Sequence, residues 1–283
     1  MTARGGVLVT GASTGIGRAC ALELHRLGYR VFAGVRKAAD GERLVAAASE
    51  RLTPVILDVT KLDTITAAAA QIDAALGATP LVGIVNNAGV GVGGPLEYLP
   101  LGDLKWQFEV NVFGQVAVTQ AFLPRLRASR GRIINIGSIG GRVSQAFMGP
   151  YCASKFAMSA LTFSLREELR PWGVQATIIE PGAIESDIWD KADASMFEIE
   201  KTLSAEALSR YRKGIDAMKR VFLRQRRHAI PALRVVEKVV IALEAPTIKA
   251  RYLPGREAKM LAFLRWLLPD ARLEAMIRKA LGL

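Results

Sequence analysis

The sequence predicts an α/β protein with a doubly wound fold, in which helices cover both faces of a central parallel sheet. Short runs that are apolar on both faces alternate with longer helical patterns, as expected for the strands of such a sheet. A glycine-rich string directly follows the first of these runs. The 283 residues are 51% hydrophobic and 23% charged, a balance that is typical of a globular protein and excludes disorder as the main state.

Each strand is predicted from a short run rich in Val and Ile, which favour strands. The six runs assigned to the parallel sheet are 7–9, 30–35, 54–58, 82–86, 131–136 and 174–179. A seventh run at 251–253 could close the sheet. Because crossovers between parallel strands are right-handed, these strands and their helices build the doubly wound arrangement.

Helical patterns fill the segments between the strands. The expected helices run from the glycine string to about residue 27, near 40–51, from the third strand to about residue 76, and over 101–128, 150–170 and 232–244. In the tail, apolar residues recur at the spacing of one helix face, at Leu273, Met276, Ile277, Ala280 and Leu281. We expect one domain over 1–283, with a helical substrate-lid insertion at 187–230 and a C-terminal helical extension at 256–283.

The net charge of +12 lies entirely in the last part of the chain, because residues 201–283 hold 19 Lys and Arg against 7 Asp and Glu. This basic surface could attract an anionic partner or could simply be solvated. No helix-turn-helix, zinc-finger spacing or basic strand with interleaved aromatic residues supports nucleic-acid binding, so we expect none. Apolar residues near 261–268 beside Lys259 and Arg265 make this region a candidate for peripheral membrane contact. Packing on its own domain or on a neighbouring subunit is the alternative.

Residues 10–17, Thr-Gly-Ala-Ser-Thr-Gly-Ile-Gly, join the first strand to the first helix. Gly11 permits a tight turn, and Gly15 and Gly17 allow a diphosphate to approach the backbone without a Cβ in the way. The N–H groups at the start of the helix then bind the anion. A glycine string alone can be a structural turn, but this position between a strand and a helix predicts a Rossmann-type dinucleotide site.

The end of the second strand distinguishes the two nicotinamide cofactors. A carboxylate there binds the ribose 2′-hydroxyl of NAD(H), whereas an arginine accommodates the 2′-phosphate of NADP(H). This strand ends in Arg36 and Lys37, with no acidic residue before Asp40. Arg36, with Lys37 and the hydroxyl of Ser13, therefore favours NADP(H), while NAD(H) stays an alternative if Arg36 is only a surface residue.

Tyr151 and Lys155 are four residues apart and share one face of a predicted helix. A phenol with a pKa of roughly 10 is a poor base at neutral pH, and a neighbouring ammonium favours the phenolate. Ser138 follows the fifth strand and presents a hydroxyl at the carboxyl edge of the sheet, where such folds bind ligands. A Tyr–Lys pair alone is more often a surface feature, so its meaning depends on the surrounding motifs.

These motifs together resemble the short-chain dehydrogenase/reductase family. The glycine string, Asn-Asn-Ala-Gly at 86–89, Asn111, Ser138, the Tyr151/Lys155 pair and Pro181-Gly182 occur in the order and spacing of that family over about residues 5–186. The resemblance implies a Rossmann-fold oxidoreductase that uses NAD(P)(H) on an alcohol/carbonyl pair. Within this family, residues 31–34, the region of Trp189 and the long tail resemble the retinol and hydroxysteroid dehydrogenase branch. This second resemblance is looser than the first.

The resemblance also implies a role for each catalytic residue. Tyr151 would exchange a proton with the substrate oxygen, and Ser138 would hold that oxygen by a hydrogen bond. Lys155 would lower the pKa of Tyr151 and bind the nicotinamide ribose, and Asn111 would position a water for proton relay. No metal is expected.

With the loop and Arg36, the resemblance gives a set of expected cofactor-binding residues. These are Gly11, Ser13, Thr14, Gly15, Ile16, Gly17, Arg36, Lys37, Asp58, Val59, Asn87, Ala88, Gly89, Tyr151, Lys155, Pro181, Gly182, Ile184 and Ser186. The family usually has threonine at the position of Ser186, which keeps the hydroxyl. Some NADP-dependent members have a basic residue where Thr14 stands, so phosphate recognition would depend on Arg36 and its neighbours.

Apolar residues around the predicted site favour a hydrophobic substrate. Val143, Ala146, Phe147 and Met148 follow Ser138, and the insertion contributes Trp189, Met196, Phe197, Tyr211 and Phe222. They could instead pack only the lid itself. We therefore expect a hydrophobic secondary alcohol or ketone, or a retinoid-like or steroid-like substrate. Two alternatives stay open: a 3-oxoacyl-thioester reductase, for which the basic region would attract an acidic carrier, and a non-catalytic NADP-binding regulator.

The sequence also gives expectations about location and assembly. The chain reaches its first strand at once, so we expect no signal peptide and a cytoplasmic protein, with the membrane periphery as an option through the basic C-terminal region. Cys20 and Cys152 are too few for a disulfide framework. A homo-oligomer, either a dimer or a tetramer, is expected.

Overall fold

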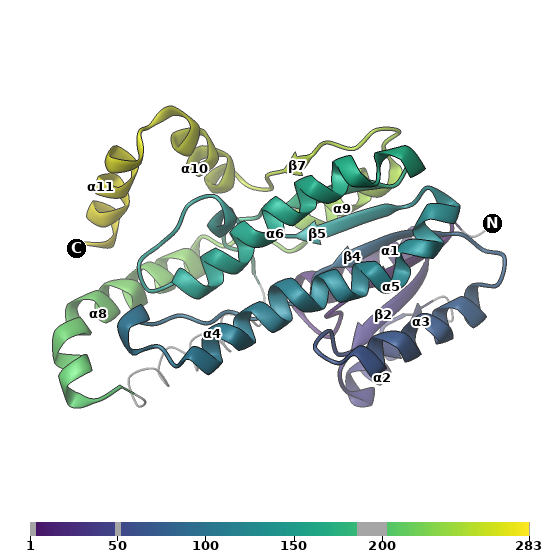
Figure 1. Ribbon diagram of the computed structural model, residues 1–283, viewed down its shortest axis with the longest axis horizontal. Coiled ribbons are helices and arrows are strands. Elements are labelled where there is room, and N and C mark those ends of the chain that lie inside the picture. The colour runs from purple at the N-terminus through teal and green to yellow at the C-terminus, as the bar shows by residue number, and fades with distance from the viewer. Residues whose placement is uncertain (1–3, 49–51, 186–202, 283) are drawn as a thin grey trace.

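The computed structural model describes residues 4–48, 52–185 and 203–282. Within them, seven parallel strands form one sheet in the order β3-β2-β1-β4-β5-β6-β7 (Figure 1). The strands are β1 (Gly6–Val9), β2 (Arg30–Val35), β3 (Leu52–Ile56), β4 (Leu81–Asn86), β5 (Arg132–Ile136), β6 (Gln175–Ile179) and β7 (Arg251–Tyr252). Since β1 and β4 are neighbours at the centre and the order runs outward from both, the fold is doubly wound, as the sequence predicts.

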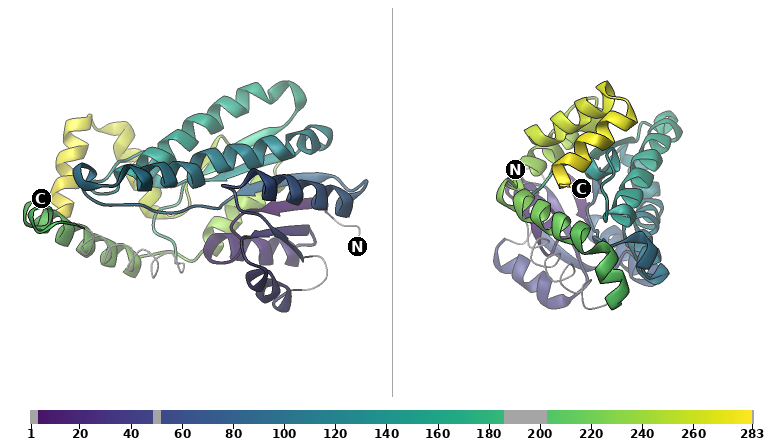
Figure 2. Two further views of the ribbon diagram at one scale, coloured as in Figure 1. Left: turned by 60° about the horizontal axis from the view of Figure 1, so that its bottom comes forward. Right: turned by 90° about the vertical axis from the view of Figure 1, so that its left-hand side faces the viewer.

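Helices cover both faces of this sheet (Figure 2). On one face, α1 (Gly15–Arg26), α2 (Ala38–Ala46) and α9 (Leu233–Glu244) pack through apolar residues such as Leu24, Leu44 and Val239. On the other face lie α3 (Leu62–Leu76), α5 (Gly114–Ser129) and α6 (Gly149–Glu168), with α4 (Leu101–Phe108) leading into α5. Apolar strand residues alternate between the two cores, which explains why the runs are apolar on both faces.

The third strand lies two residues earlier than predicted, at Leu52–Ile56 instead of 54–58. Pro54 lies inside the strand, opposite Ala33, which is tolerated because β3 is at the edge of the sheet. Asp58 then accepts hydrogen bonds from the N–H (3.1 Å) and the hydroxyl (2.8 Å) of Thr60, so the chain turns there. The preceding helix is Ala38–Ala46, shorter at its end than the predicted 40–51.

The predicted helix over 101–128 is not one regular helix. A π-helical turn, η2 (Glu109–Phe113), separates α4 from α5. Gly114, just after it, packs so closely that a Cβ there would lie 2.6 Å from the Val59 carbonyl oxygen. The wide turn carries Asn111, and such π turns are frequent at functional sites.

The carboxyl end of the sheet is covered by three helices, α8 (Ala205–Arg227), α10 (Arg256–Leu267) and α11 (Asp270–Leu281) (Figure 1). In α11, Leu273 is buried and Met276 is half-buried, as the stripe predicts, whereas Ala280 is exposed. Of the predicted lid at 187–230, the part at 187–202 lies outside the described residues, and most of the rest is α8.

Candidate functional site

The glycine-rich loop packs tightly against the chain that follows β4. Gly11 has φ +63°, and a Cβ on it would lie 2.8 Å from the Ala88 Cα. A Cβ on Gly17 would lie 2.2 Å from the Gly11 carbonyl oxygen. Gly15 also has a positive φ, +55°. Any side chain at Gly11 or Gly17 would therefore push the loop out of place, which accounts for both glycines.

Thr10 and Asn87 hold this loop by reciprocal hydrogen bonds. The Asn87 Nδ2 donates to the carbonyl oxygens of Thr10 (2.9 Å) and Gly11 (3.1 Å). The Thr10 hydroxyl accepts from the backbone N–H groups of Asn87 (2.9 Å) and Ala88 (3.0 Å). Asn87 and Ala88, which are predicted to line the cofactor, thus lie against the glycine loop, while Thr10 was not among the predicted site residues. Its position between strand and glycine string is the signal that could have indicated it.

The start of α1 fits a bound diphosphate. Its N-cap residue, Thr14, is extended and makes no side-chain capping hydrogen bond, and the first turn contains no acidic residue. The first N–H groups of a helix lack partners within the helix and attract anions, an effect strengthened by the helix dipole. The predicted residues Ser13, Gly15 and Ile16 surround this helix end, half-buried. The residues present are therefore compatible with the dinucleotide that the motif implies.

Arg36 and Lys37 lie exposed just beyond the end of β2. The glycine loop is next to them, because its Ala12 N–H donates a hydrogen bond to the carbonyl of Gly34 in β2 (2.9 Å). Asp40, the first acidic residue, forms an ion pair with Arg43 on α2. On the neighbouring strand, Asp58 is half-buried at the carboxyl edge and Val59 is buried. These residues line one end of the same sheet edge, where the adenosine part of a dinucleotide would lie.

Ser138 and Tyr151 are brought together at the carboxyl end of β5. Ser138 begins the short turn η3 (Ile139–Gly141), where its hydroxyl accepts from the Gly140 N–H (3.1 Å), and it also hydrogen-bonds Tyr151. A Cβ on Gly140 would lie 3.3 Å from the Tyr151 ring and 3.4 Å from the Ser138 hydroxyl oxygen. The glycine therefore lets the turn pass close to both hydroxyl groups. Pro150, at the second position of α6, suits a helix start and places Tyr151 in the first turn.

Lys155 lies one turn further along α6, with its ammonium 5.8 Å from the centre of the Tyr151 ring. The Nζ donates a hydrogen bond to the Ile136 carbonyl (3.0 Å), and burial lowers the pKa of Lys155 to about 8. Burial raises the pKa of Tyr151, and the hydrogen bond from Ser138 opposes that effect. The net shift of the Tyr151 pKa is thus upward in the protein without ligand, because burial of the phenol has the largest effect, and the lowering expected from Lys155 stays a prediction. The phenol is held in its protonated form.

Asn111 belongs to a line of three amide side chains that bind the backbone of residues 88–92. Its Oδ1 accepts from the Val90 N–H (2.8 Å), and its Nδ2 donates to the Val90 carbonyl (3.0 Å) and to the Ser154 hydroxyl (3.2 Å). Gln107 accepts from the Val92 N–H (2.6 Å) and donates to the Val90 carbonyl (2.8 Å). Gln115 donates to the Ala88 carbonyl.

Sequence reasoning missed Gln107, Gln115 and Ser154. The signal was present, since the amides occur at i, i+4 and i+8 on an otherwise buried helix face. The structure thus shows Asn111 as a residue that fixes the loop containing Gly89, next to Tyr151 and Lys155. A Cβ on Gly89 would lie 3.3 Å from the Asn111 Oδ1, so this loop also approaches closely.

Residues 181–184 close the site from β6. The Pro181 carbonyl accepts from the Ile139 N–H (2.9 Å), which ties this turn to the segment after Ser138. Gly182 faces α10, since a Cβ there would lie 3.4 Å from the Glu257 carboxylate. Ile184 is buried and pairs with Ile230. Ser186 lies outside the described residues, as do Trp189, Met196 and Phe197.

Phe147 connects the segment before Tyr151 to α8. It has φ +66°, a left-handed conformation that is rare for an aromatic residue. Its ring points at Gly214 of α8, where a Cβ would lie 2.2 Å from the ring, and it meets the Tyr211 ring edge-on with centroids 6.1 Å apart. The Tyr211 hydroxyl donates to the Glu97 carboxylate (2.7 Å). Phe147 and Glu97 thus anchor α8.

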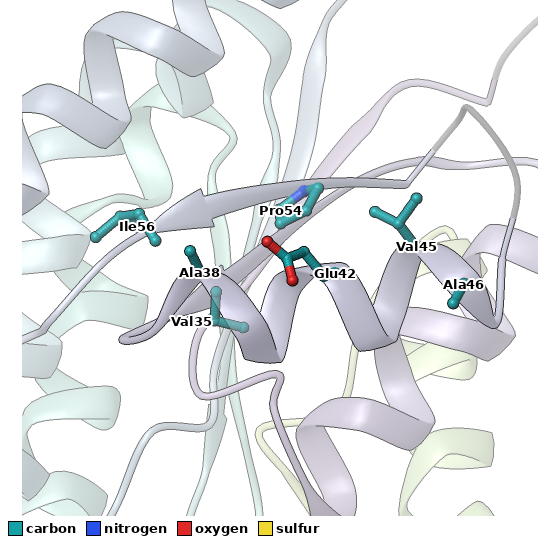
Figure 3. Close-up of a pocket in the computed structure, with 7 residues that line it drawn as sticks. All are labelled: Val35, Ala38, Glu42, Val45, Ala46, Pro54 and Ile56. Carbon is teal, nitrogen blue, oxygen red and sulfur yellow. The ribbon is translucent and has the colours of Figure 1, made fainter.

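A separate hollow of about 510 Å³ lies between α2 and the edge strand β3 (Figure 3). Its lining residues are Val35, Ala38, Glu42, Val45, Ala46, Pro54 and Ile56. None of the predicted site residues lines it. We assign the candidate site to the carboxyl edge of the sheet.

Comparison with known proteins agrees with this geometry. Residues 6–196 match the short chain dehydrogenase family. The chain belongs to the short-chain dehydrogenase/reductase family. It is 33% identical over 279 residues to the NADPH-dependent 3-dehydrocapnine reductase of Ornithobacterium rhinotracheale, covering 97% of this chain and 96% of that protein.

Two further relatives of this short-chain dehydrogenase/reductase extend the comparison. Retinol dehydrogenase 5 of Mus musculus is 35% identical over 288 residues, covering 93% of this chain and 88% of that protein, which supports the likeness to the retinol and hydroxysteroid branch. A short-chain dehydrogenase/reductase from Burkholderia phymatum, solved in complex with NAD, is 27% identical with a TM-score of 0.77, covering 96% of this chain and 95% of that one. The protein is thus an oxidoreductase of a family that uses nicotinamide cofactors.

Proposed function

We propose that this protein transfers a hydride between NADP(H) and a hydrophobic secondary alcohol or ketone, or a retinoid-like or steroid-like substrate, with Tyr151 as the acid or base. The observation that carries the proposal is that the Ser138 and Tyr151 side chains both approach Gly140, with Lys155 one turn away, at the sheet edge that also holds the glycine loop. When bound, the dinucleotide supplies the hydride chemistry, and the protein supplies orientation and proton transfer.

The chain's own residues divide this work. The Tyr151 phenol, protonated in the free protein, gives its proton to the substrate oxygen during reduction. The Ser138 hydroxyl donates a hydrogen bond to the same oxygen as negative charge grows there, where electrostatic stabilisation is most effective. Lys155 would hold the nicotinamide ribose with its buried ammonium. Asn111 keeps the loop at 88–92 in place beside these three residues. In the proposed role, Asn111 would also position a water for proton relay to Lys155.

The remaining predicted residues would hold the cofactor. The start of α1 would bind the diphosphate, and Asp58 and Val59 the adenine, because they lie at the carboxyl edge beside the loop. Ile184 and Ser186 would contact the carboxamide. The preference for NADP(H) is supported by exposed Arg36 and Lys37 and by the pairing of Asp40 with Arg43, which occupies the first carboxylate after β2. A relative named as NADPH-dependent agrees with that choice.

A hydrophobic substrate is supported by the apolar segment before Tyr151. Val143 is buried, Phe147 and Met148 are half-buried, and α8 is anchored over this segment through Tyr211 and Gly214. We include α8 in the proposed lid, in one domain over 1–283. The name of the retinol dehydrogenase relative points to the same class of substrate.

Replacing Tyr151 with Phe tests this function. We expect Tyr151→Phe to remove nearly all turnover of NADPH with a panel of ketones and retinoids. The variant lacks the phenol that would give its proton to the substrate oxygen, and the Ser138 hydroxyl alone would only hold that oxygen. NADPH binding, followed by cofactor fluorescence, should stay within about twofold of the wild type, since the hydroxyl is small beside the whole cofactor contact. Turnover equal to that of the wild type would overturn the assignment.

The panel should include 3-oxoacyl thioesters. Preferred turnover of thioesters would replace the proposed substrate class, and NADPH binding without turnover of any carbonyl would indicate a regulator.

We also propose a cytoplasmic homo-oligomer. Its support is a group of exposed aromatic side chains on η2 and α6, namely Phe113, Phe156 and Phe163. Light scattering after size-exclusion chromatography measures the oligomeric state.

A further inference from the structure

Helix α10 carries apolar side chains on two opposite faces. Its inner face is covered by the protein, with Ala258 and Ala262 buried. Its outer side presents four large apolar residues to solvent: Trp266 is 77% exposed, Met260 and Phe263 are each 55% exposed, and Leu267 is 54% exposed. Single exposed apolar residues are normal, but a group of this kind marks an interaction surface.

The four residues form one contiguous strip, which we call the α10 strip. Met260, Phe263 and Leu267 follow at i, i+3 and i+7, so they lie on the same helix face. Trp266 flanks them, and its ring centre is 5.9 Å from that of Phe263. The strip is built on a regular helix of 12 residues and does not depend on a loop.

Basic residues accompany the α10 strip. Arg256 and Lys259 precede Met260 and Phe263 by four residues each, so both cations share this side of the helix. Arg265 forms an ion pair with Asp270 instead. Residues 256–282 contain six Lys and Arg against three Asp and Glu.

We propose that the α10 strip docks on the surface of an anionic lipid bilayer. A helix with Trp, Phe, Leu and Met beside Arg and Lys is suited to lie in the plane of the membrane interface. Anionic headgroups would complement the cations, each of which adds to the attraction. No helix in the described part of the chain is long and apolar enough to cross a membrane. The proposed contact is a peripheral one, made by the exposed face of α10.

The charge pattern favours lipid over a second copy of the chain. In a symmetric dimer the same patch meets itself, so Arg256 and Lys259 would lie against a strip that offers apolar side chains and further cations but no carboxylate. Covering cations without an acidic partner disfavours the complex. An anionic surface supplies the missing negative charge and covers the apolar residues at the same time.

Docking would also turn the candidate site toward the membrane. The start of α10 lies against the turn at 181–182, since a Cβ on Gly182 would be 3.8 Å from the Ala258 nitrogen, and α10 packs on η3 next to Ser138 (Figure 1). A hydrophobic alcohol or ketone dissolved in the bilayer would then be close to Tyr151. This last step rests on the proposed function, whereas lipid binding by the α10 strip does not.

Vesicle co-sedimentation tests the proposal with the full-length protein. We expect the wild type to bind vesicles that contain phosphatidylserine, to bind pure phosphatidylcholine more weakly, and to lose affinity at high salt. The double variant Phe263→Ser/Trp266→Ser should bind roughly tenfold more weakly or worse, because two large apolar side chains no longer enter the interface. Trp172→Ser is the matched control: Trp172 is 50% exposed, lies far from α10 in sequence and should not affect binding.

The outcomes separate the proposal from its alternatives. No binding by the wild type, or equal binding by the double variant, overturns it. Loss of self-association in the double variant without any lipid binding would assign the α10 strip to a second copy and also overturn it. Turnover of NADPH with a water-soluble ketone should be the same in the double variant as in the wild type. Failure of the proposed function would appear there, independently of sedimentation.

Discussion

Lys155 is a buried cation with a single described hydrogen bond, to the Ile136 carbonyl. Burial lowers its pKa to about 8 from an ordinary value of 10.5. Between these two pH values the unfolded chain keeps the proton that the folded protein releases, so the free energy of unfolding rises with pH in this window. Below about pH 8, both states are charged, and the folded state carries the full cost of the buried ammonium.

We therefore predict that Lys155→Met stabilises the cofactor-free protein at pH 7, by up to about 3 kcal/mol, the value of the pKa change. This advantage should shrink steadily between pH 8 and pH 10.5, where the wild type gains stability. Urea unfolding of both proteins across this range measures the difference. A constant difference at all pH values would show that Lys155 is not destabilised by its charge. The same variant should lose turnover.

At this scale the sequence indicates the chemistry well but not its energetics. The spacing of Tyr151 and Lys155 correctly predicts that they share a helix face, and the glycine string correctly predicts a turn at which side chains are excluded. The direction of the Tyr151 pKa shift depends on how deeply the phenol is buried, which packing decides and spacing does not. Thr10 was missed because its role lies in a contact with residues 77 positions away.

Helix α8 depends on a close contact that can be tested directly. The Phe147 ring fills the place of a side chain at Gly214, and Phe147 adopts a left-handed backbone at a cost of roughly 1–3 kcal/mol. We predict that Gly214→Ala lowers the free energy of unfolding by about 1–3 kcal/mol, because the new methyl group collides with the ring. Thermal and urea unfolding would measure this change.

Gly102→Ala is the matched control for that prediction. Gly102 also lies in a helix, α4, but a Cβ there would meet nothing within 4 Å. Alanine should therefore stabilise that helix by about 0.5–1 kcal/mol. The double variant Gly214→Ala/Phe147→Ala should lose less than the sum of its single changes, since the collision disappears with the ring. Strict additivity would mean that Phe147 and Gly214 do not interact.

The elements themselves were predicted more accurately than their ends. Alternation of apolar runs and helical patterns identified all the strands of the described sheet, because strands buried on both faces have no polar side to obscure them. The shift of β3 arose from Pro54, which an edge strand tolerates. The π turn at Asn111 could not be foreseen, since the i, i+4 and i+8 spacing of the three amide side chains is that of a regular helix and gives no sign of a wider turn.

For the molecule as a whole, the candidate cofactor site draws on both halves of the sheet. The glycine loop follows β1, Arg36 follows β2, Asp58 follows β3, and Pro181 follows β6. A ligand that contacts all of these binds only the folded state, and it stabilises that state by mass action. Order along the chain and a resemblance to a family predicted these residues, and the parallel topology brings their strand ends to one edge.

Cofactor binding should therefore raise the melting temperature of the entire protein. At a concentration one hundred times the dissociation constant, the gain is about 2.7 kcal/mol. We predict that NADP raises the melting temperature more than NAD at equal concentration, because Arg36 can pair with the 2′-phosphate. Arg36→Ser should reduce the NADP effect to that of NAD. Arg26→Ser serves as control: it removes an exposed arginine at the end of α1 that pairs with Glu23, and the order NADP over NAD should persist. Equal shifts with both cofactors in the wild type would contradict the assignment of Arg36, and a larger shift with NAD would reverse it.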